Sequence, residues 1–438
     1  MPQPGNWGFA IRALRSRNYR LFFSGQSTSL VGTWMTRIAT SWLVYRFTRS
    51  PFLLGLVSFA GQIPLFFVAP IAGVWVDRWN RHRTLVVTQV LSMLQSFALA
   101  WLALAHVITV WEVICLMLFQ GLVNAFDMPA RQAFVVQMVE DRRDLSNAIA
   151  LNSSMVNAAR LVGPALAGVI IAAVGEGYCF LLDGISYVAV IVSLLMMHVE
   201  PQTIGHAGKR LWHDLAEGWN YVAESVPIRS ILLLLALVSL VGMPYTVLMP
   251  IFAAQVLHGG AHTLGFLMAA SGVGALTSAI TLAARRSVLG LGRMIPLSTG
   301  IFGAALIAFA FSRVLWISIL LLLATGFGFL QQMAASNTIL QTIVAEEKRG
   351  RVMAYYSMAF QGVAPFGSLL AGALAARIGA PSTLAGGGAF CILGGVWFAR
   401  ELAEIRRMVR PVYIELGILP EVAAGIQSAS ALQTPPEH

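Results

Sequence analysis

The chain between residues 73 and 83 reads GVWVDRWNRHR, a short basic stretch that separates two long apolar runs. The flanking runs, near 52–75 and 84–105, are long enough to cross a hydrocarbon core of about 30 Å at roughly 1.5 Å per residue. Similar runs recur along the chain. We therefore predict twelve spans, the other ten lying near 18–46, 110–138, 145–173, 178–198, 228–256, 263–284, 294–311, 315–344, 352–376 and 382–400.

The composition also indicates a membrane protein built of helices. Only 11% of the 438 residues are charged, against roughly 25% in an ordinary soluble domain, so the chain cannot cover a water-facing surface. The runs are continuously apolar and do not alternate, which favours helices over a membrane barrel. We expect an all-α integral membrane protein that lies in a lipid bilayer.

The formal charge of +10 would suit nucleic-acid binding, but the distribution of the basic residues argues against it. Lys and Arg concentrate in the N-terminal segment, in alternate loops and near the C-terminal tail, whereas the opposite loops hold only Arg46, Arg49, Arg313 and Arg377. This bias follows the positive-inside rule. Both termini are therefore predicted to be cytoplasmic, and no nucleic-acid partner is expected.

The two halves of the sequence resemble each other. Leu54-Gly55-Leu56 can be matched with Leu264-Gly265-Phe266, and Gly168 can be matched with Gly372. Transporters of this length are often made of such internal repeats. We therefore predict two pseudo-symmetric six-helix bundles with a cavity between them.

The predicted segments follow from this division. The bundles occupy residues 18–198 and 228–400, and a cytoplasmic linker at 199–227 ends in an amphipathic helix at the membrane surface. Residues 1–17 and 401–438 are expected to be cytoplasmic, the second segment beginning with a short helix.

Polar residues recur every three or four positions on three predicted spans, so each set shares one helix face. The first span carries Gln26, Ser29, Thr33 and Arg37, the fourth Gln120, Asn124, Asp127 and Arg131, and the fifth Ser153, Asn157 and Arg160. We expect these faces to line a wet cavity. The spans of the second half hold no acidic residue, and their polar candidates include Gln331 and Gln361.

Charged residues inside the spans are the candidates for proton coupling, because each costs about 2.5–3.5 kcal/mol to insert and faces a cavity or a partner. Depths along the helices lead us to pair Asp127 with Arg160, and Arg131 with Asp77. An alternative is that these are static ion pairs that hold the first bundle together. Asp127 is the first candidate for proton exchange, and Asp183 is the second.

The stretch at 73–83 has features that the positive-inside rule does not explain. Gly73 permits close helix approach, and Asp77 at the helix end can pair with an arginine or with a neighbouring helix N-terminus. We predict a latch on the cytoplasmic side. The stretch resembles the loop signature of the major facilitator superfamily, G-x-x-x-D-R-x-x-R-x-R. The predicted cytoplasmic gate comprises Gly73, Asp77, Arg78, Arg81, Arg83 and Arg131.

A second stretch supports this resemblance. Residues 160–168 read RLVGPALAG, which is similar to the antiporter motif of exporters in that superfamily. In that motif Gly163, Pro164 and Gly168 would shape a bend and a close helix contact. One position departs from the family, because Met117 stands where the exporter motif around Gln120 usually has Arg.

Stretches at 18–22, 125–133 and 147–153 resemble the enterobactin-exporter-like, or transmembrane secretion effector, branch. The resemblance covers about residues 15–400. It implies twelve spans, alternating access and export driven by proton entry, in the plasma membrane of a bacterium. We predict proton-coupled export of a small amphipathic molecule, such as a siderophore or a drug, by a monomer.

Other functional classes fit the sequence less well. The phosphate-binding pattern G-x-x-x-x-G-K-[ST] and the hydrolase pattern G-x-S-x-G do not occur. The eight His are scattered without metal-ligand spacing, so no enzyme activity, metal or cofactor is expected. Two alternatives stay open: a transporter of lysophospholipid or another lipid, and a sensor with a transporter fold that binds a ligand without moving it.

Overall fold

The computed structural model describes residues 12–139, 141–199, 211–285 and 287–415, and its regular elements there are all helices. The first half contains η1 (Arg12–Arg15), α2 (Arg17–Thr48), α3 (Pro51–Arg78), α4 (Arg81–Leu104), α5 (Val110–Met138), η2 (Arg142–Asp144), α6 (Leu145–Val174) and α7 (Glu176–Leu195). The second half, after α8 (Leu211–Glu224), contains α9 (Val226–Leu237), η3 (Val238–Gly242), α10 (Tyr245–Ile251), η4 (Phe252–Val256), α11 (Ala261–Ala283), α12 (Leu291–Phe311), α13 (Leu315–Ile343), α14 (Glu346–Ser357), η5 (Met358–Gly362), α15 (Ala364–Ile378) and α16 (Ala380–Glu415).

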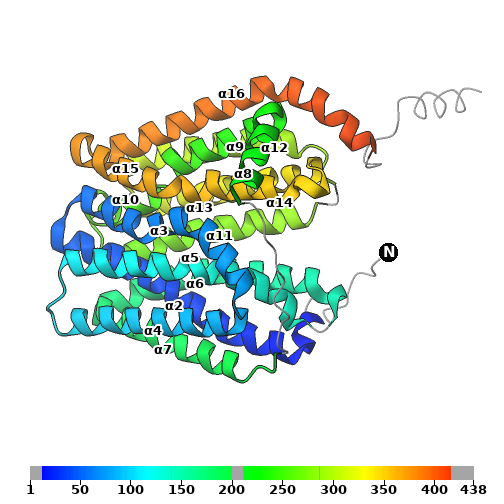
Figure 1. The fold of residues 1–438 in the computed structure, drawn as a ribbon. Helices are drawn as coiled ribbons and strands as arrows, with labels where there is room; N and C mark the ends of the chain where they lie inside the picture. Colours follow the sequence, from blue (N-terminus) through cyan, green and yellow to red (C-terminus); the bar gives the residue numbers. More distant parts are fainter. Residues whose placement is uncertain (1–11, 140, 200–210, 286, 416–438) are drawn as a thin grey trace, which may run out of the picture.

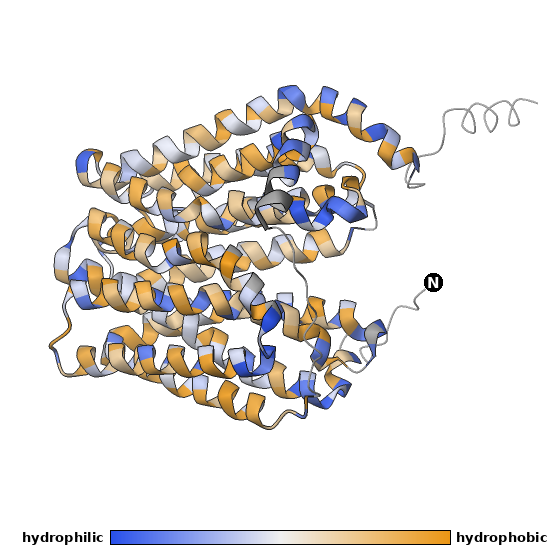
Figure 2. Cartoon of the chain, in the orientation of Figure 1, coloured by the Kyte–Doolittle hydropathy of each residue, from blue (hydrophilic) through white to orange (hydrophobic). Residues whose placement is uncertain are grey.

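The predicted all-α membrane fold is confirmed. Eleven helical segments among the described residues are long and apolar enough to cross a membrane, and two of them, Val226–Val256 and Glu346–Ile378, are built from consecutive helical elements. α2 is a further long helix of 32 residues, and its polar face makes it less apolar than the others. Figure 2 shows apolar residues along the middle of the helices and hydrophilic residues gathered toward the helix ends.

The helices form two bundles, which lie one above the other in Figure 1. In the first bundle, α2 packs against α6 and α7, α5 packs against α3 and α4, and α4 packs against α7. In the second, α13 packs against α11 and α12, and α16 packs against α12 and α9. The bundles meet along two seams, α3 with α15 and α6 with α11.

Each seam contains a pair of glycines that lets two helix backbones touch. A Cβ atom added to Gly55 of α3 would lie 3.0 Å from the Cα atom of Gly372 in α15. One added to Gly168 of α6 would lie 2.9 Å from the Cα atom of Gly265 in α11. Only a residue without a side chain allows so close an approach. Because the sequence matches Gly55 with Gly265 and Gly168 with Gly372, the two seams are equivalent under the pseudo-symmetry.

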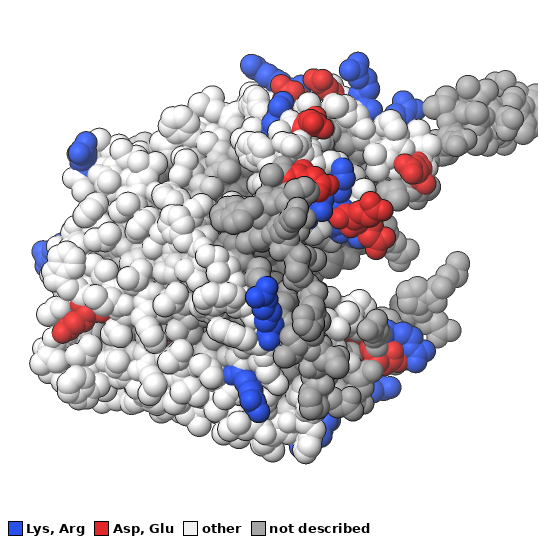
Figure 3. Space-filling model, viewed as in Figure 1, with Lys and Arg blue, Asp and Glu red and all other residues white. Residues whose placement is uncertain are grey.

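Both glycine pairs lie at one end of the molecule, which we call the closed end. Gly55 and Gly265 are in the first turns of α3 and α11, and Gly168 and Gly372 are in the last two turns of α6 and α15. The other end, called the terminal end, holds η1, α8 and the last turns of α16. Most of the charged side chains in Figure 3 gather at the terminal end.

The predicted span at 228–256 is not a continuous α-helix. The π-helical turns η3 and η4 flank the short α10, whose N-cap is Pro244. Proline has no N–H group to bond to the preceding turn, so the helical ladder is interrupted. A third π-helix, η5, precedes Pro365, and the Ser239 hydroxyl donates to the Phe360 carbonyl oxygen at 2.5 Å. Such turns are frequent at functional sites, and here Pro244 lines the cavity described below.

Two elements outside the bundles bear on the predicted segments. α8 lies inside the predicted linker and contacts α14 through an ion pair of Glu217 with Arg351, at 2.6 Å. The predicted short helix after residue 400 is the C-terminal part of α16, which runs unbroken from the last span to Glu415. Pro411 lies inside this helix. Residues 416–438 lie outside the described residues, and the predicted segment boundaries remain predictions.

A polar cavity between the two bundles

A cavity of about 210 Å³ lies between the bundles and receives side chains from both. The first bundle supplies Thr33, Thr36, Arg37, Ile38, Thr40, Ser41, Leu54, Val57, Ser58, Gly61, Gln62, Gln95, Met117, Gln120, Asn124, Asp183 and Tyr187. The second supplies Met243, Pro244, Thr246, Val247, Met268, Ala364 and Ser368. Both charged residues of the lining come from the first bundle, whereas the second bundle contributes a mostly apolar wall.

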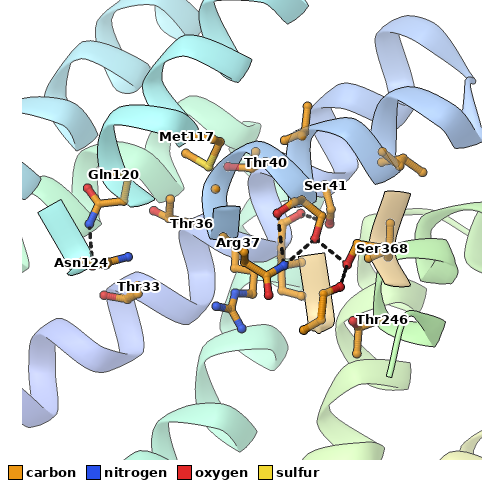
Figure 4. Close-up of a pocket in the computed structure, with 18 of the residues that line it drawn as sticks. Thr33, Thr36, Arg37, Thr40, Ser41, Met117, Gln120, Asn124, Thr246 and Ser368 are labelled. Atoms are coloured by element: carbon orange, nitrogen blue, oxygen red, sulfur yellow. Dashed lines mark hydrogen bonds between the residues drawn. The ribbon is translucent and has the colours of Figure 1, made fainter. Parts of the chain in front are cut away.

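The face of α2 that lines the cavity is one of the polar faces predicted from spacing. Thr33, Thr36, Arg37, Thr40 and Ser41 follow each other at helical intervals on this face. Figure 4 shows Arg37 extending from α2 into the space between residues of both bundles. α2 therefore provides the longest polar strip in the cavity wall.

Asp183 of α7 lines the cavity without a cationic partner. Its Oδ2 atom accepts hydrogen bonds from the Thr36 and Ser96 hydroxyls, both at 2.8 Å. Its Oδ1 atom has no hydrogen-bond partner, although Asp183 is only 2% exposed. Among the described residues, no arginine, lysine or histidine lies within ion-pair distance of this carboxyl group. A proton can therefore bind here without breaking an ion pair.

Asp127 of α5 has different surroundings. Its side chain forms an ion pair with Arg131, four residues further along the same helix. It also accepts hydrogen bonds from the Thr88 hydroxyl and the Gln89 Nε2 atom of α4, both at 2.8 Å. Asp127 is 4% exposed and does not line the cavity. This carboxylate joins α4 to α5.

The predicted pair of Asp127 with Arg160 is wrong. Residues at i and i+4 on a helix are neighbours, so Arg131 reaches Asp127 within α5, whereas α6, which carries Arg160, packs mainly on α2 and α11. The predicted pair of Arg131 with Asp77 is not tested, because the Asp77 side chain lies outside the described residues.

Arg37 and Arg160 both lie near the ring of the same tryptophan, although they come from α2 and α6. The Arg37 guanidinium carbon lies 4.7 Å from the centroid of the Trp34 ring, and that of Arg160 lies 5.8 Å from it. Arg160 also lies 5.9 Å from the centroid of Phe329 in α13, so its guanidinium contacts aromatic rings of both bundles. Throughout the described chain, neither arginine has a carboxylate within 4.0 Å.

The aromatic contacts lower the energetic cost of these two charges but do not cancel it. Each arginine costs about 2.5–3.5 kcal/mol near the centre of a spanning helix. A desolvated cation–π contact recovers about 2 kcal/mol, and contacts near 6 Å or open to water recover less. The two guanidinium groups also repel each other. Neither guanidinium group is therefore neutralised by an ion pair with a described carboxylate, and Arg160, a predicted cavity charge, is not among the lining residues.

The other predicted cavity residues divide into two groups. Gln120 and Asn124 line the cavity, and the Gln120 Nε2 atom donates to the Ser92 hydroxyl at 3.0 Å and to Asn124 Oδ1 at 3.2 Å. Four residues, although predicted, are absent from the lining: Gln26, Asn157, Gln331 and Gln361.

Three of the four absent residues have clear alternative positions. Gln26 is buried within its bundle. Asn157 donates to the Ser153 carbonyl oxygen of its own helix at 2.9 Å. The Gln331 Oε1 atom accepts from the Ser278 hydroxyl at 2.8 Å, which joins α13 to α11. Asn157 and Gln331 therefore form hydrogen bonds outside the cavity, and Gln26 is enclosed within its own bundle.

Sequence reasoning missed a polar contact between the bundles. The Ser58 hydroxyl of α3 donates to the Ser368 hydroxyl of α15 at 3.2 Å, and the Gln62 Nε2 atom donates to Ser58 Oγ at 2.9 Å. Figure 4 shows this chain of contacts at one side of the cavity. The i, i+4 spacing of Ser58 and Gln62 within an apolar run was the available signal.

The predicted cytoplasmic gate lies at the terminal end. Gly73 is within α3, and no atom of the described residues lies within 4 Å of the position that a Cβ would take. Arg78 and Arg83 are exposed, and Arg81 is half-buried. The Asn80 side chain accepts from the Arg83 backbone N–H at 3.0 Å and caps α4. The stretch therefore forms a capped turn between two helices.

The antiporter-type motif contacts two neighbouring helices of α6, which are α2 and α11. A Cβ added to Gly163 would lie 2.4 Å from the Trp34 Cβ atom, so this glycine lets α2 approach and sets the position of the tryptophan. Pro164 lies inside α6, and its carbonyl oxygen would lie 2.7 Å from a Cβ added to Gly265. Together with Gly168, it forms the seam with α11.

A protein-family model described as transmembrane secretion effector matches residues 9–408 of the chain. The chain belongs to the transmembrane secretion effector family. This agrees with the motifs in the sequence. The arrangement of two helical bundles also agrees with the fold of solved structures.

Relatives of this transporter include a siderophore transporter and a drug pump. It is 27% identical to the staphyloferrin A transporter of Staphylococcus aureus over 354 residues, which cover 80% of this chain and 88% of the relative. It is 25% identical to the multidrug efflux pump Tap of Mycolicibacterium fortuitum over 368 residues, which cover 81% of this chain and 88% of the relative. These matches support a small-molecule transporter and not an enzyme.

Solved structures match the fold at low sequence identity. A bacterial homologue of the iron transporter ferroportin, in an inward-facing state, covers 88% of this chain and 98% of its own, with a TM-score of 0.69 and 16% identity. A POT family transporter in complex with 5-aminolevulinic acid covers 92% and 99%, with a TM-score of 0.71 and 12% identity. The chain is therefore a multi-pass membrane protein with the major facilitator fold.

Proposed function

We propose that this transporter exports a small amphipathic molecule in exchange for protons, by alternating access, and that Asp183 carries the proton. The position of Asp183 is the observation that carries the proposal. It lines the cavity, two hydroxyls bind its Oδ2 atom, and its Oδ1 atom is free of partners. Proton uptake on Asp127 would instead leave Arg131 without its counter-ion. The order of the two candidates is thus the reverse of the sequence prediction.

The groups around Asp183 suit a carboxyl group that changes its charge. Thr36 and Ser96 can turn their hydroxyls to donate to a carboxylate or to accept from a carboxylic acid. Tyr187 and Arg37 line the same cavity, and the Tyr187 hydroxyl lies 3.4 Å from that of Thr33. Each proton that binds removes one negative charge from the cavity wall, and such a change biases which conformation is favoured.

We assign the terminal end to the cytoplasm, following the positive-inside rule. Under this assignment, the glycine seams close the outer side of the transporter. The absence of any contact from a described residue at the Cβ position of Gly73 supports the same state. Outward opening would then require separation of Gly55 from Gly372 and of Gly168 from Gly265.

The names of the relatives support two substrate classes, siderophores and drugs. The experiment therefore uses one probe from each class, staphyloferrin A and ethidium, with purified protein in liposomes that contain a pH-sensitive dye. A proton gradient should drive uphill movement of a substrate. Asp183→Asn should abolish this uphill movement and retain downhill exchange of labelled for unlabelled substrate, since exchange needs no change in protonation.

Two matched variants make the test specific. Asp127→Asn should retain coupling, because that carboxylate is outside the cavity. Asp141→Asn, in the short segment after α5, removes a carboxylate from a loop and serves as the control. Coupled movement that survives in Asp183→Asn would overturn the assignment of the proton site. Binding without movement in the wild type would favour a sensor, and gradient-independent movement of lysophospholipid would favour a lipid transporter.

A further inference from the structure

We infer that the substrate is an amphipathic anion whose carboxylate or similar group binds between Arg37 and Arg160. The inference rests on the proposed function, because it names the substrate class for the same cavity. Arg37 lines the cavity and is exposed within it. Arg160 lies beside the same indole ring and is half-buried at the boundary of the bundles.

The two arginines keep their hydrogen-bond donors free. Trp34 and Phe329 attract the guanidinium charge through their ring faces, which uses no N–H group. Neither arginine donates a hydrogen bond to any other described residue. A guanidinium carries five N–H donors in a planar fork that matches a carboxylate or a phosphate. Both arginines therefore have unused donors, Arg37 within the cavity and Arg160 beside the same Trp34 ring.

Among the described residues, no carboxylate forms an ion pair with either arginine. Asp127 is bound to Arg131, and Asp183 is bound to two hydroxyls on the α4 and α2 side of its helix. The second bundle has no acidic residue within its predicted spans. Buried charges are retained in spanning helices where they meet a partner or a transported ion. An anionic substrate supplies the missing partner.

The apolar part of the lining specifies the rest of the substrate. The second bundle supplies Met243, Val247 and Met268, and the first supplies Met117, so three of these four side chains are unbranched thioethers. Methionine adapts its shape to a bound apolar group and makes favourable contacts with aromatic rings. Because Arg37 and the thioethers line one cavity, a molecule with one anionic end and one apolar or aromatic end would satisfy both parts of the lining.

Charge balance links this site to Asp183. Exchange for protons requires the anion to bind while Asp183 is ionised, so the attraction of the two arginines must exceed the repulsion between Asp183 and the anion. Two arginines then balance Asp183 and one bound anion. Export of an anion and entry of a proton each make the inside of the cell more positive. An inside-negative potential should therefore accelerate the cycle.

The test uses three probes that share one apolar body and differ in charge: 2-naphthoate, 2-naphthamide and 2-naphthylmethylammonium. Equilibrium binding is measured on the purified full chain in lipid nanodiscs. The wild type should bind naphthoate at least tenfold more tightly than the amide, and the ammonium least tightly. Arg37→Gln and Arg160→Gln should each weaken naphthoate binding by tenfold or more and leave amide binding unchanged, whereas Arg37→Lys should retain part of the preference.

The control is Arg377→Gln, which removes an exposed arginine from the last turn of α15 at the closed end. It should bind all three probes as the wild type does. Equal binding of naphthoate and naphthamide by the wild type would overturn the inference without any reference to a variant. Equal losses for all three probes in Arg37→Gln would also overturn it, because they would indicate a structural role.

Flux measurements separate this inference from the proposed function. Selective naphthoate binding combined with naphthoate and proton movement in the same direction would overturn proton exchange and leave the anion site standing. Proton-driven export of ethidium, with no preference for naphthoate, would support exchange and overturn the anion site.

Discussion

The glycine seams make a quantitative prediction about the closed end. In Gly168→Ala, the added Cβ would lie 2.9 Å from the Gly265 Cα atom and 3.0 Å from the Ala261 carbonyl oxygen. Carbon atoms pack best at about 3.5–4.0 Å, so α6 and α11 must separate by roughly 0.5–1 Å while the seam is closed. Such overpacking costs about 1–3 kcal/mol, and only the closed conformation bears it. The ratio of open to closed states should therefore rise about 5–150-fold.

The assay is a distance measurement between spin labels at the closed end, one in each bundle. Arg49 and Arg313 are exposed in loops there, and both are replaced with cysteine in a Cys115→Ala background, because Cys115 is the exposed native thiol. Gly168→Ala should increase the population of the longer distance. Gly300→Ala is the matched control, since no atom lies within 4 Å of its Cβ position in α12. If both variants give the wild-type distribution, the α6–α11 seam does not close this end.

The remaining predictions concern stability. Asp127→Asn should destabilise the protein by about 3 kcal/mol, the low end for a broken buried pair because Arg131 is partly exposed, and thermal unfolding in detergent measures this. Coupling lost at unchanged stability would contradict the structural role of Asp127. Glu217→Gln at the α8–α14 contact should change stability by less than about 1 kcal/mol, because the pair is partly exposed to solvent. A larger loss would mean that α8 contributes more to the fold than this ion pair indicates.

The sequence predicts the spans well because polar groups are costly to place in lipid, and the hydropathy of a segment reports this cost directly. It also predicts the cavity face of α2, where Thr33 and Arg37 recur at helical spacing, and the face of α5 with Gln120 and Asn124. Periodicity identifies which residues share a face. It does not determine which other helix that face meets.

The errors follow from this limit. Asp127 was paired with Arg160 by depth alone, yet α6 packs mainly on α2 and α11, so Arg131 in α5 is the nearer cation. Gln331 was assigned to the cavity, but the rotation of α13 turns it toward Ser278. Ser58 and Ser368 were not identified, because each is a lone hydroxyl that gains a partner only when α3 meets α15.

The exchange of partners between the seams indicates how such a molecule could have begun. Gly55 corresponds to Gly265, and Gly168 corresponds to Gly372. In each seam, the first glycine of one half therefore contacts the second glycine of the other half. Two identical subunits of an isologous dimer pair their residues in the same way. A single ancestral unit of six helices, paired with a second copy, would have formed both seams from one set of residues. In a single fused chain, one seam can change without a change in the other. At equivalent positions, Gln62 faces the cavity whereas Gly272 lies against the Arg160 carbonyl oxygen. The two seams therefore share their glycine contacts and differ about two turns further along each helix.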